Sequence, residues 1–407
     1  MPRPGLYVAT IRLGLAVLIA ASVCRAVVTC ATVGPMGSRF GPHPTSDYIQ
    51  FHAAGRLQDE YGLARLYDVD LQDRVIRRLF PTIPAGGHLA VAAPPWLAAI
   101  FHPLSRLPIG GSFAAWMILS VFIYMVAIAV TLRSLGPPPG LDVPTTWLAA
   151  LAFEPFAVEC VLGGQLSILG ALVLALTLAA DRDGRPILAG ACLSLLSYKP
   201  SLLPLLVLSA LAGRRWRLLG GFALGLAALA LLSLAAAGWD GCLGYLRLLA
   251  RYGRAGGSSS AAFQAQKYVD LGAWLRSLGL PPRYAPLVGL PALLLVLAAW
   301  SRSARGPGPA RDQAWASAMI LCPILTPYGP TYDVTAAAPG LLLALWGSRR
   351  LTTSTVSRLI LVLAGGIFVS GWASFVLANL DIPFQVQTPF LMATGMLVAS
   401  RTIPYEL

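Results

Sequence analysis

Long apolar runs, each close to the length of a membrane span, fill most of this 407-residue chain. The runs are continuous and do not alternate between apolar and polar residues, and in lipid only helices or closed barrels satisfy the backbone. We therefore predict an all-α polytopic integral membrane protein, a single domain over residues 1–407 with about twelve transmembrane helices. The expected spans cover residues 11–33, 113–132, 145–162, 166–180, 218–237, 284–300, 314–327, 334–346, 357–377 and 386–400, with two half-length pieces flanking 197–201.

The longest polar interruption follows the first span. Residues 44–80 carry six acidic side chains and five arginines, so this segment has to lie in water. It belongs to a large first outer loop, residues 34–110, in which we expect two short helices, one capped by Ser46 or Asp47 and one capped by Asp70. A short apolar piece, 96–107, is too brief to span at 1.5 Å per residue and is expected to be re-entrant or interfacial. A second long outer loop is expected at 238–282.

The charge of the chain, +13 at neutral pH, lies mostly in arginine-rich turns beside apolar runs. That distribution sets orientation in a membrane, and with a mean hydropathy of +0.70 it argues against nucleic acid as a partner. The expected topology places the basic turns at 213–217, 301–312 and 347–358 in the cytoplasm. The polar features without arginine then gather on the opposite face, so we expect a multi-pass protein of the cytoplasmic membrane whose site faces outside.

Asp47 and Lys199 are the two strongest candidates for chemistry. Asp47 is either a helix cap or a general base that takes a proton from an acceptor hydroxyl. Lys199 is one of only two lysines among thirty basic residues and lies at a Pro-broken junction of two short apolar helices. An ammonium there is functional by default, unless it snorkels to the interface, and a compact cation suits a phosphate or pyrophosphate head group.

Other polar residues have two interpretations each. Gln165, at a Gly-Gly turn, and Asp333 can hydrogen-bond a polar ligand at the outer face, or serve only as turn and cap residues. Asp68-Val69-Asp70 matches the DxD pattern that holds a divalent ion in soluble sugar-nucleotide enzymes, but it stands at a helix start, where acidic residues suit the dipole. We expect no metal site: neither the four histidines nor the six cysteines have metal-ligand spacing.

The order of several short motifs resembles glycosyltransferase family 87. The motifs are S-D-Y-x-x-F-x-x-A from Ser46, G-x-x-x-L-Y-D from Gly62, the Pro94-Pro95 pair, G-G-Q at 163–165, Y-K-P at 198–200, R-R-W-R at 214–217, and P-Y-x-x-x-Y-D from Pro327. The resemblance covers roughly residues 10–345 and implies a GT-C type bundle with a catalytic aspartate in the first outer loop. Carried onto this chain, that aspartate matches Asp47.

The resemblance also implies a function. Its best-known members are polyprenol-phosphate-mannose-dependent mannosyltransferases, so we expect a hexose, mannose by analogy, to pass from a polyprenyl-phosphate donor to a glycan or glycolipid acceptor, with inversion and without a cofactor. Lys199, Tyr198, Gln165, Tyr328 and Asp333 are the candidate donor-binding residues. The alternative is a lipid or polysaccharide transporter or flippase, which would place coupled charges and pseudo-symmetric broken helices in the membrane.

Overall fold

A computed structural model provides the structure of the chain. It describes residues 4–32, 46–83, 90–136, 138, 141–255, 264–303, 308–348 and 354–401. Throughout these ranges the secondary structure is helical, and the one bridge between extended residues joins Tyr268 to Pro330. The all-α prediction is therefore confirmed for the part of the chain that the structure describes.

The helices follow one another with short connections. In chain order they are α1 (Pro4–Thr32), α2 (Ser46–Tyr61), η1 (Leu63–Arg65), α3 (Val69–Leu79), α4 (Pro95–Ala98), α5 (Phe101–Ser105), α6 (Ile109–Leu135), α7 (Val143–Leu151), η2 (Pro155–Leu162), α8 (Ser167–Arg182), α9 (Pro186–Ser194), η3 (Leu195–Tyr198), η4 (Pro200–Leu202), α10 (Leu203–Ala212), α11 (Trp216–Ala255), η5 (Ala265–Lys267), α12 (Leu271–Ser277), η6 (Pro282–Tyr284), α13 (Ala285–Ser303), α14 (Pro309–Leu321), η7 (Thr331–Ala337), α15 (Ala338–Gly347), α16 (Ser354–Asn379) and α17 (Gln387–Ser400).

Five described helices are long and apolar enough to cross a membrane, or six if α7 and η2, which meet at 46°, form one broken span. Several of the expected spans are shorter. For example, α14 has 13 residues and α17 has 14, whereas a straight crossing needs about 20. The figure of about twelve spans therefore remains a prediction. The two half-length helices expected around Lys199 are present as apolar pieces at Pro186–Tyr198 and Pro200–Ala212.

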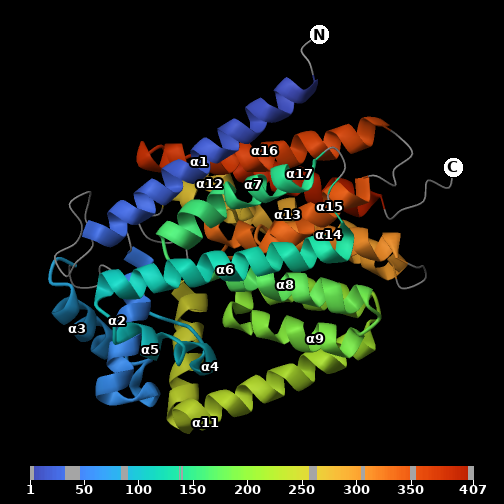
Figure 1. Ribbon diagram of the computed structural model, residues 1–407. Coiled ribbons are helices and arrows are strands. Elements are labelled where there is room, and N and C mark those ends of the chain that lie inside the picture. Colours follow the sequence, from blue (N-terminus) through green and yellow to red (C-terminus); the bar gives the residue numbers. More distant parts are fainter. Residues whose placement is uncertain are drawn as a thin grey trace.

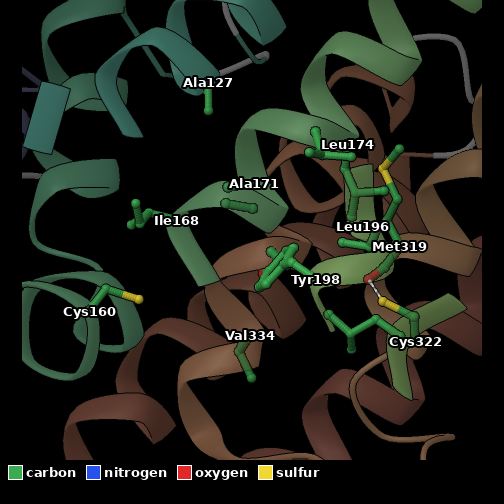
Figure 2. Packing of buried hydrophobic residues seen from close by; sticks show 14 of the residues in the cluster. Ala127, Cys160, Ile168, Ala171, Leu174, Leu196, Tyr198, Met319, Cys322 and Val334 are labelled. Carbon is green, nitrogen blue, oxygen red and sulfur yellow. Dashed lines mark hydrogen bonds between the residues drawn. The ribbon is translucent and has the colours of Figure 1, made fainter. Parts of the chain in front are cut away.

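The long helices lie side by side, and α2 to α5 gather at one end of the bundle (Figure 1). Helix α8 packs between α6 and α9, and α14 packs against α15 and α17. Buried side chains from distant parts of the chain meet in the centre, among them Leu174, Leu196 and Met319 (Figure 2). This apolar core fixes the helix ends on which the polar residues stand.

Helix α11 changes direction at Gly238, which has a φ of 66°. Glycine adopts this backbone conformation readily, whereas other residues would be strained in it. The expected span ended at residue 237, and the chain beyond it was expected to be loop. Instead it continues as a second helical arm, residues 239–255, which packs against η1 and α4 at the same end of the molecule (Figure 1).

In the first loop, the structure corrects one cap. Asp68, not Asp70, caps α3: its Oδ1 accepts a hydrogen bond from the Leu71 amide at 3.1 Å, and Asp70 lies in the first turn. Helix α2 begins at Ser46, so Asp47 stands inside its first turn. The apolar piece at 96–107 forms two short helices, α4 and α5, instead of a span.

Candidate active site

The first turn of α2 is held firmly against α6 and against the Gly163-Gly164-Gln165 turn. Tyr48 is fully buried, and its hydroxyl donates to the Ser112 carbonyl at 3.0 Å. Gly164 has a φ of 77°, and a Cβ there would come within 2.6 Å of the Tyr48 Cβ. Trp116 Nε1 donates to the Gly164 carbonyl at 3.1 Å. Glycine is therefore required at position 164 by both conformation and space, and the contact places Asp47 beside Gln165.

Asp47 is half-buried and accepts a hydrogen bond from Gln165 Nε2 at 2.5 Å. Burial raises the pKa of the Asp47 carboxyl above its ordinary value. The hydrogen bond from Gln165 and the positive charges of Lys267 and Lys199 act against that rise. Asp47 is thus a carboxylate with raised basicity and an amide, not a cation, as its hydrogen-bond partner.

Lys199 forms an ion pair with Asp333, with 2.5 Å between its Nζ and the Asp333 Oδ1. The ammonium also lies 4.2 Å from the centre of the Tyr332 ring, which favours a cation. Ser167 Oγ donates to the same carboxylate oxygen at 2.8 Å. Asp333 is fully buried, and its second oxygen, Oδ2, has no hydrogen-bond partner among the described residues. The pair therefore retains one unused acceptor.

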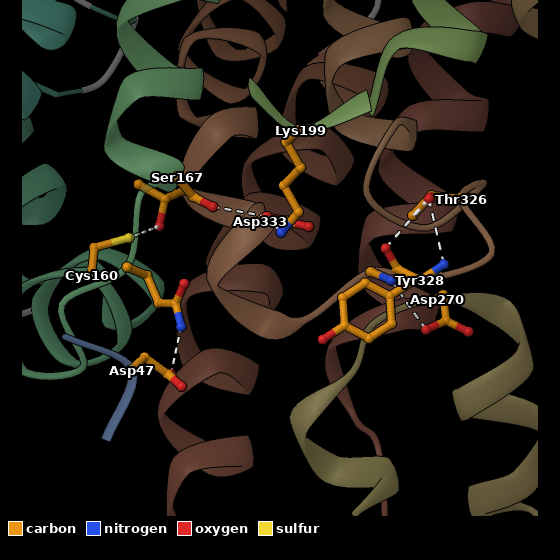
Figure 3. Close-up of polar contacts among 11 residues, drawn as sticks. Asp47, Cys160, Ser167, Lys199, Asp270, Thr326, Tyr328 and Asp333 are labelled. Carbon is orange, nitrogen blue, oxygen red and sulfur yellow. Dashed lines mark hydrogen bonds and ion pairs between the residues drawn. The ribbon is translucent and has the colours of Figure 1, made fainter. Parts of the chain in front are cut away.

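The start of α8 joins these two groups. Gln165 bonds Asp47, and two residues later Ser167 bonds Asp333, which holds Lys199 (Figure 3). Residues from α2, α8, η7 and the η3–η4 junction thus meet at one end of the bundle. Of the six candidate residues named from sequence, Asp47, Gln165, Lys199 and Asp333 are linked in this way.

The two candidate tyrosines occupy different surroundings. Tyr198 lies in the apolar core beside Leu196 and Ala171, and a Cβ on Gly170 would come within 2.9 Å of its hydroxyl (Figure 2). The hydroxyl is buried close to Ser167 and has no hydrogen-bond partner among the described residues. Tyr328 lies on the other side of Tyr332: its ring centre lies 5.4 Å from that of Tyr268, and its side chain also interacts with Tyr332, the ring beneath the Lys199 ammonium.

Sequence reasoning did not assign Lys267 and Asp270 to the site. Lys267 is exposed and close enough to Asp47 for its charge to lower the pKa of that carboxyl. Asp270 caps α12 and also accepts from the Gly329 amide at 3.3 Å, which ties the second loop to the segment before Asp333. The scarcity of lysine was the signal that could have identified Lys267, because the chain has only one other lysine.

No group of three or more His, Cys, Asp or Glu side chains within the described ranges could hold a metal ion. His52 is buried, with Nδ1 3.1 Å from the Ser112 hydroxyl, and burial lowers its pKa to about 4. His102 pairs with Asp59 at 2.5 Å on the surface of the first loop. His43 and His88 lie outside the described residues. The six cysteines are free thiols.

Comparison with known proteins identifies the family of the chain. The sequence model of glycosyltransferase family 87 matches residues 93–327, which is more than half of the chain. Neither the curated protein sequences nor the solved structures contain a significant match. The chain belongs to glycosyltransferase family 87.

Proposed function

We propose that this member of glycosyltransferase family 87 transfers a hexose, mannose in our expectation, from a polyprenyl-phosphate donor to a glycan or glycolipid acceptor. The transfer takes place on the extracytoplasmic side of the cytoplasmic membrane and inverts the anomeric carbon. Membership of the family supports glycosyl transfer in a membrane. The identity of the donor, the sugar and the side of the membrane belong to the proposal.

The observation that carries the proposal is the connection between Asp47 and Lys199 through the start of α8. A base for the acceptor and a cation for the donor phosphate have to serve one sugar between them. Gln165 and Ser167, two residues apart, bond the two carboxylates concerned. The raised pKa of Asp47 suits a general base, because a carboxylate of ordinary pKa is a weaker proton acceptor.

In the proposed reaction, Asp47 accepts the proton of the acceptor hydroxyl as that oxygen forms a bond to the anomeric carbon. The bond from this carbon to the lipid phosphate oxygen breaks, and the phosphate leaves with the electron pair. One displacement inverts the centre, so a β-linked donor gives an α product and no second carboxylate is needed as nucleophile.

The leaving phosphate needs positive charge nearby more than it needs an acid. Lys199 is already paired with Asp333. The carboxylate fixes the position of the ammonium but cancels most of its positive charge. Lys267 is exposed and has no ion pair within the described residues, which makes it the second candidate for the phosphate. The two lysines of the chain thus serve the same end of the molecule.

Replacing Asp47 with Asn tests the proposal. The change keeps the shape and removes the base, so we expect radiolabelled sugar transfer in membranes to fall by about 10²- to 10⁴-fold while expression is unchanged. Asp240→Asn is the control, because Asp240 is an exposed carboxylate on the second arm of α11. Transfer by the Asp47 variant at the rate of the control would remove Asp47 from the mechanism.

A further inference from the structure

A polar pocket lies apart from the candidate active site. It has a volume of about 360 Å³, which falls in the range of small-molecule sites. It is formed where η1 and the start of α3 face the second arm of α11. Its lining consists of Ala64, Arg65, Tyr67, Asp68, Val69, Asp70, Gly244, Arg247, Leu248 and Arg251.

Three guanidinium groups face this pocket, against two carboxylates. Arg65 lies 3.2 Å from Asp68, whose other oxygen caps α3. Arg247 and Arg251 are four residues apart, so they share one face of α11, and neither pairs with a carboxylate of the described chain. Guanidinium forks are well suited to phosphate, which accepts two parallel hydrogen bonds from each. The pocket therefore has the charge and the donors to bind a phosphate ester.

The second arm of α11 also has the features of a helix at a membrane surface. The first arm, residues 216–237, rises about 33 Å and is long enough to cross the hydrocarbon core. After the bend at Gly238, Trp239 is 67% exposed and Leu246 is 57% exposed. Exposed Trp and Leu beside arginines are typical of an interfacial helix, with Trp at the head-group level. The pocket thus opens beside a surface suited to lipid.

The pocket is separate from the reacting groups. Helix α2 connects them, with Asp47 in its first turn and η1 just after its end. Its 16 residues rise about 24 Å. A phosphate held by Arg247 and Arg251 is therefore too distant to be the one that leaves during transfer.

We propose that this pocket binds the phosphate of a lipid head group at the membrane surface. The DxD pair does not make it a divalent-cation site: Asp68 is already engaged by the Leu71 amide and Arg65, and the arginines repel a cation. The lipid tails would lie along the apolar side chains of the second arm, and the phosphate would lie between the arginines.

The test uses the detergent-purified full-length protein and two probes with the same tails. Dioctanoyl phosphatidic acid carries the phosphate, and dioctanoylglycerol lacks it. We expect the first to bind and the second not to bind. For the double variant Arg247→Gln/Arg251→Gln, we expect the affinity for phosphatidic acid to fall at least about tenfold. The matched control is Arg185→Gln/Arg217→Gln, which removes the same charge from exposed arginines elsewhere.

Further outcomes separate the alternatives. Asp70→Asn should tighten phosphatidic acid binding a few-fold, because it removes a negative charge from the pocket; weaker binding would contradict an anion site. Glycerol 3-phosphate that binds as tightly as phosphatidic acid would overturn a lipid ligand in favour of a soluble phosphate ester. Equal affinities for the double variant and its control, or no binding by the unaltered protein, would overturn the proposal altogether.

Discussion

Charged side chains from several elements gather at both ends of α8, and their partners differ between the two ends. At the C-terminal end, Asp181 is 1% exposed and bonds Arg215 and the Trp315 indole, the latter at 2.8 Å. Arg311 lies 3.7 Å from the same carboxylate. This cluster joins α8, the turn just before α11, and α14, and each of its charges faces an opposite charge within the protein.

At the N-terminal end, the charges are left partly open. Asp47 has an amide as its hydrogen-bond partner, Asp333 has an unused oxygen, and Lys267 is exposed without an ion pair in the described chain. Buried or half-buried groups without full partners are costly unless something else binds them. Buried atoms without a hydrogen bond occur at both ends, since Arg311 Nε and Asp312 Oδ1 also lack one. The N-terminal end differs in having a carboxylate bonded by an amide and a lysine without an ion pair in the described chain, so it retains capacity for a ligand.

The largest expected effect comes from breaking the Lys199–Asp333 pair. Lys199→Met leaves the fully buried Asp333 without its cation, and removing one partner of a buried pair costs about 3–5 kcal/mol. We expect a marked fall in the thermal unfolding midpoint in detergent. The double variant Lys199→Met/Asp333→Asn should recover most of it, because no uncompensated charge remains.

The same double variant sharpens the comparison. If the pair contributes to donor binding, the double variant should be stable but should bind a polyprenyl-phosphate analogue more weakly than the unaltered protein does. If it regains both stability and transfer, the pair is a structural joint like the one at Asp181, and its role in the site is refuted.

The opposite end of α8 should respond in stability alone. Asp181→Asn weakens the attraction for Arg215 and Arg311 but can still accept from Trp315, so we expect a loss of about 2–3 kcal/mol. The transfer rate per folded molecule should not change. Asp183→Asn, in the exposed turn just after α8, is the control. A selective loss of transfer in the Asp181 variant would contradict the division between the two ends.

Much of this arrangement could be predicted from the sequence. Continuous apolar runs predicted helices, and the break around Lys199 and the polar loop after the first span both pointed to candidate residues. The family assignment rested on the order of short motifs, and the match over residues 93–327 confirms it.

The remainder depended on tertiary contacts. The pairing of Lys199 with Asp333 joins residues 134 positions apart, and no local pattern encodes it. The second arm of α11 was missed because Gly238 was interpreted as the end of a helix, whereas it only bends the chain. The expected spans at 314–327 and 386–400 correspond to α14 and α17, of 13 and 14 residues, and their crossing of the membrane stays a prediction.

Gln165→Leu tests the N-terminal end of α8 by removing the hydrogen bond from Gln165 to Asp47. The bond from Gln165 lowers the pKa of Asp47, so its loss should raise that pKa further. A general base works only when it is deprotonated. The acid limb of the pH profile of the transfer rate should therefore move to higher pH. On the acid limb we expect roughly a tenfold loss of rate, which shrinks as the pH rises above the limb. Gln58→Leu removes a comparable amide bond, to the Ala98 carbonyl at 2.9 Å, and should leave the limb in place.

Lys267→Gln should have the smallest effect. Lys267 is exposed, so water and salt screen its charge. At low salt we expect the donor KM to rise about threefold and the acid limb to move slightly to higher pH, because the charge of Lys267 lowers the pKa of Asp47. Both differences should shrink as salt is added. Arg283→Gln, an exposed arginine before α13, controls for net charge. A donor KM equal to that of the unaltered protein at low salt would leave Lys199 as the sole lysine at the open end of α8.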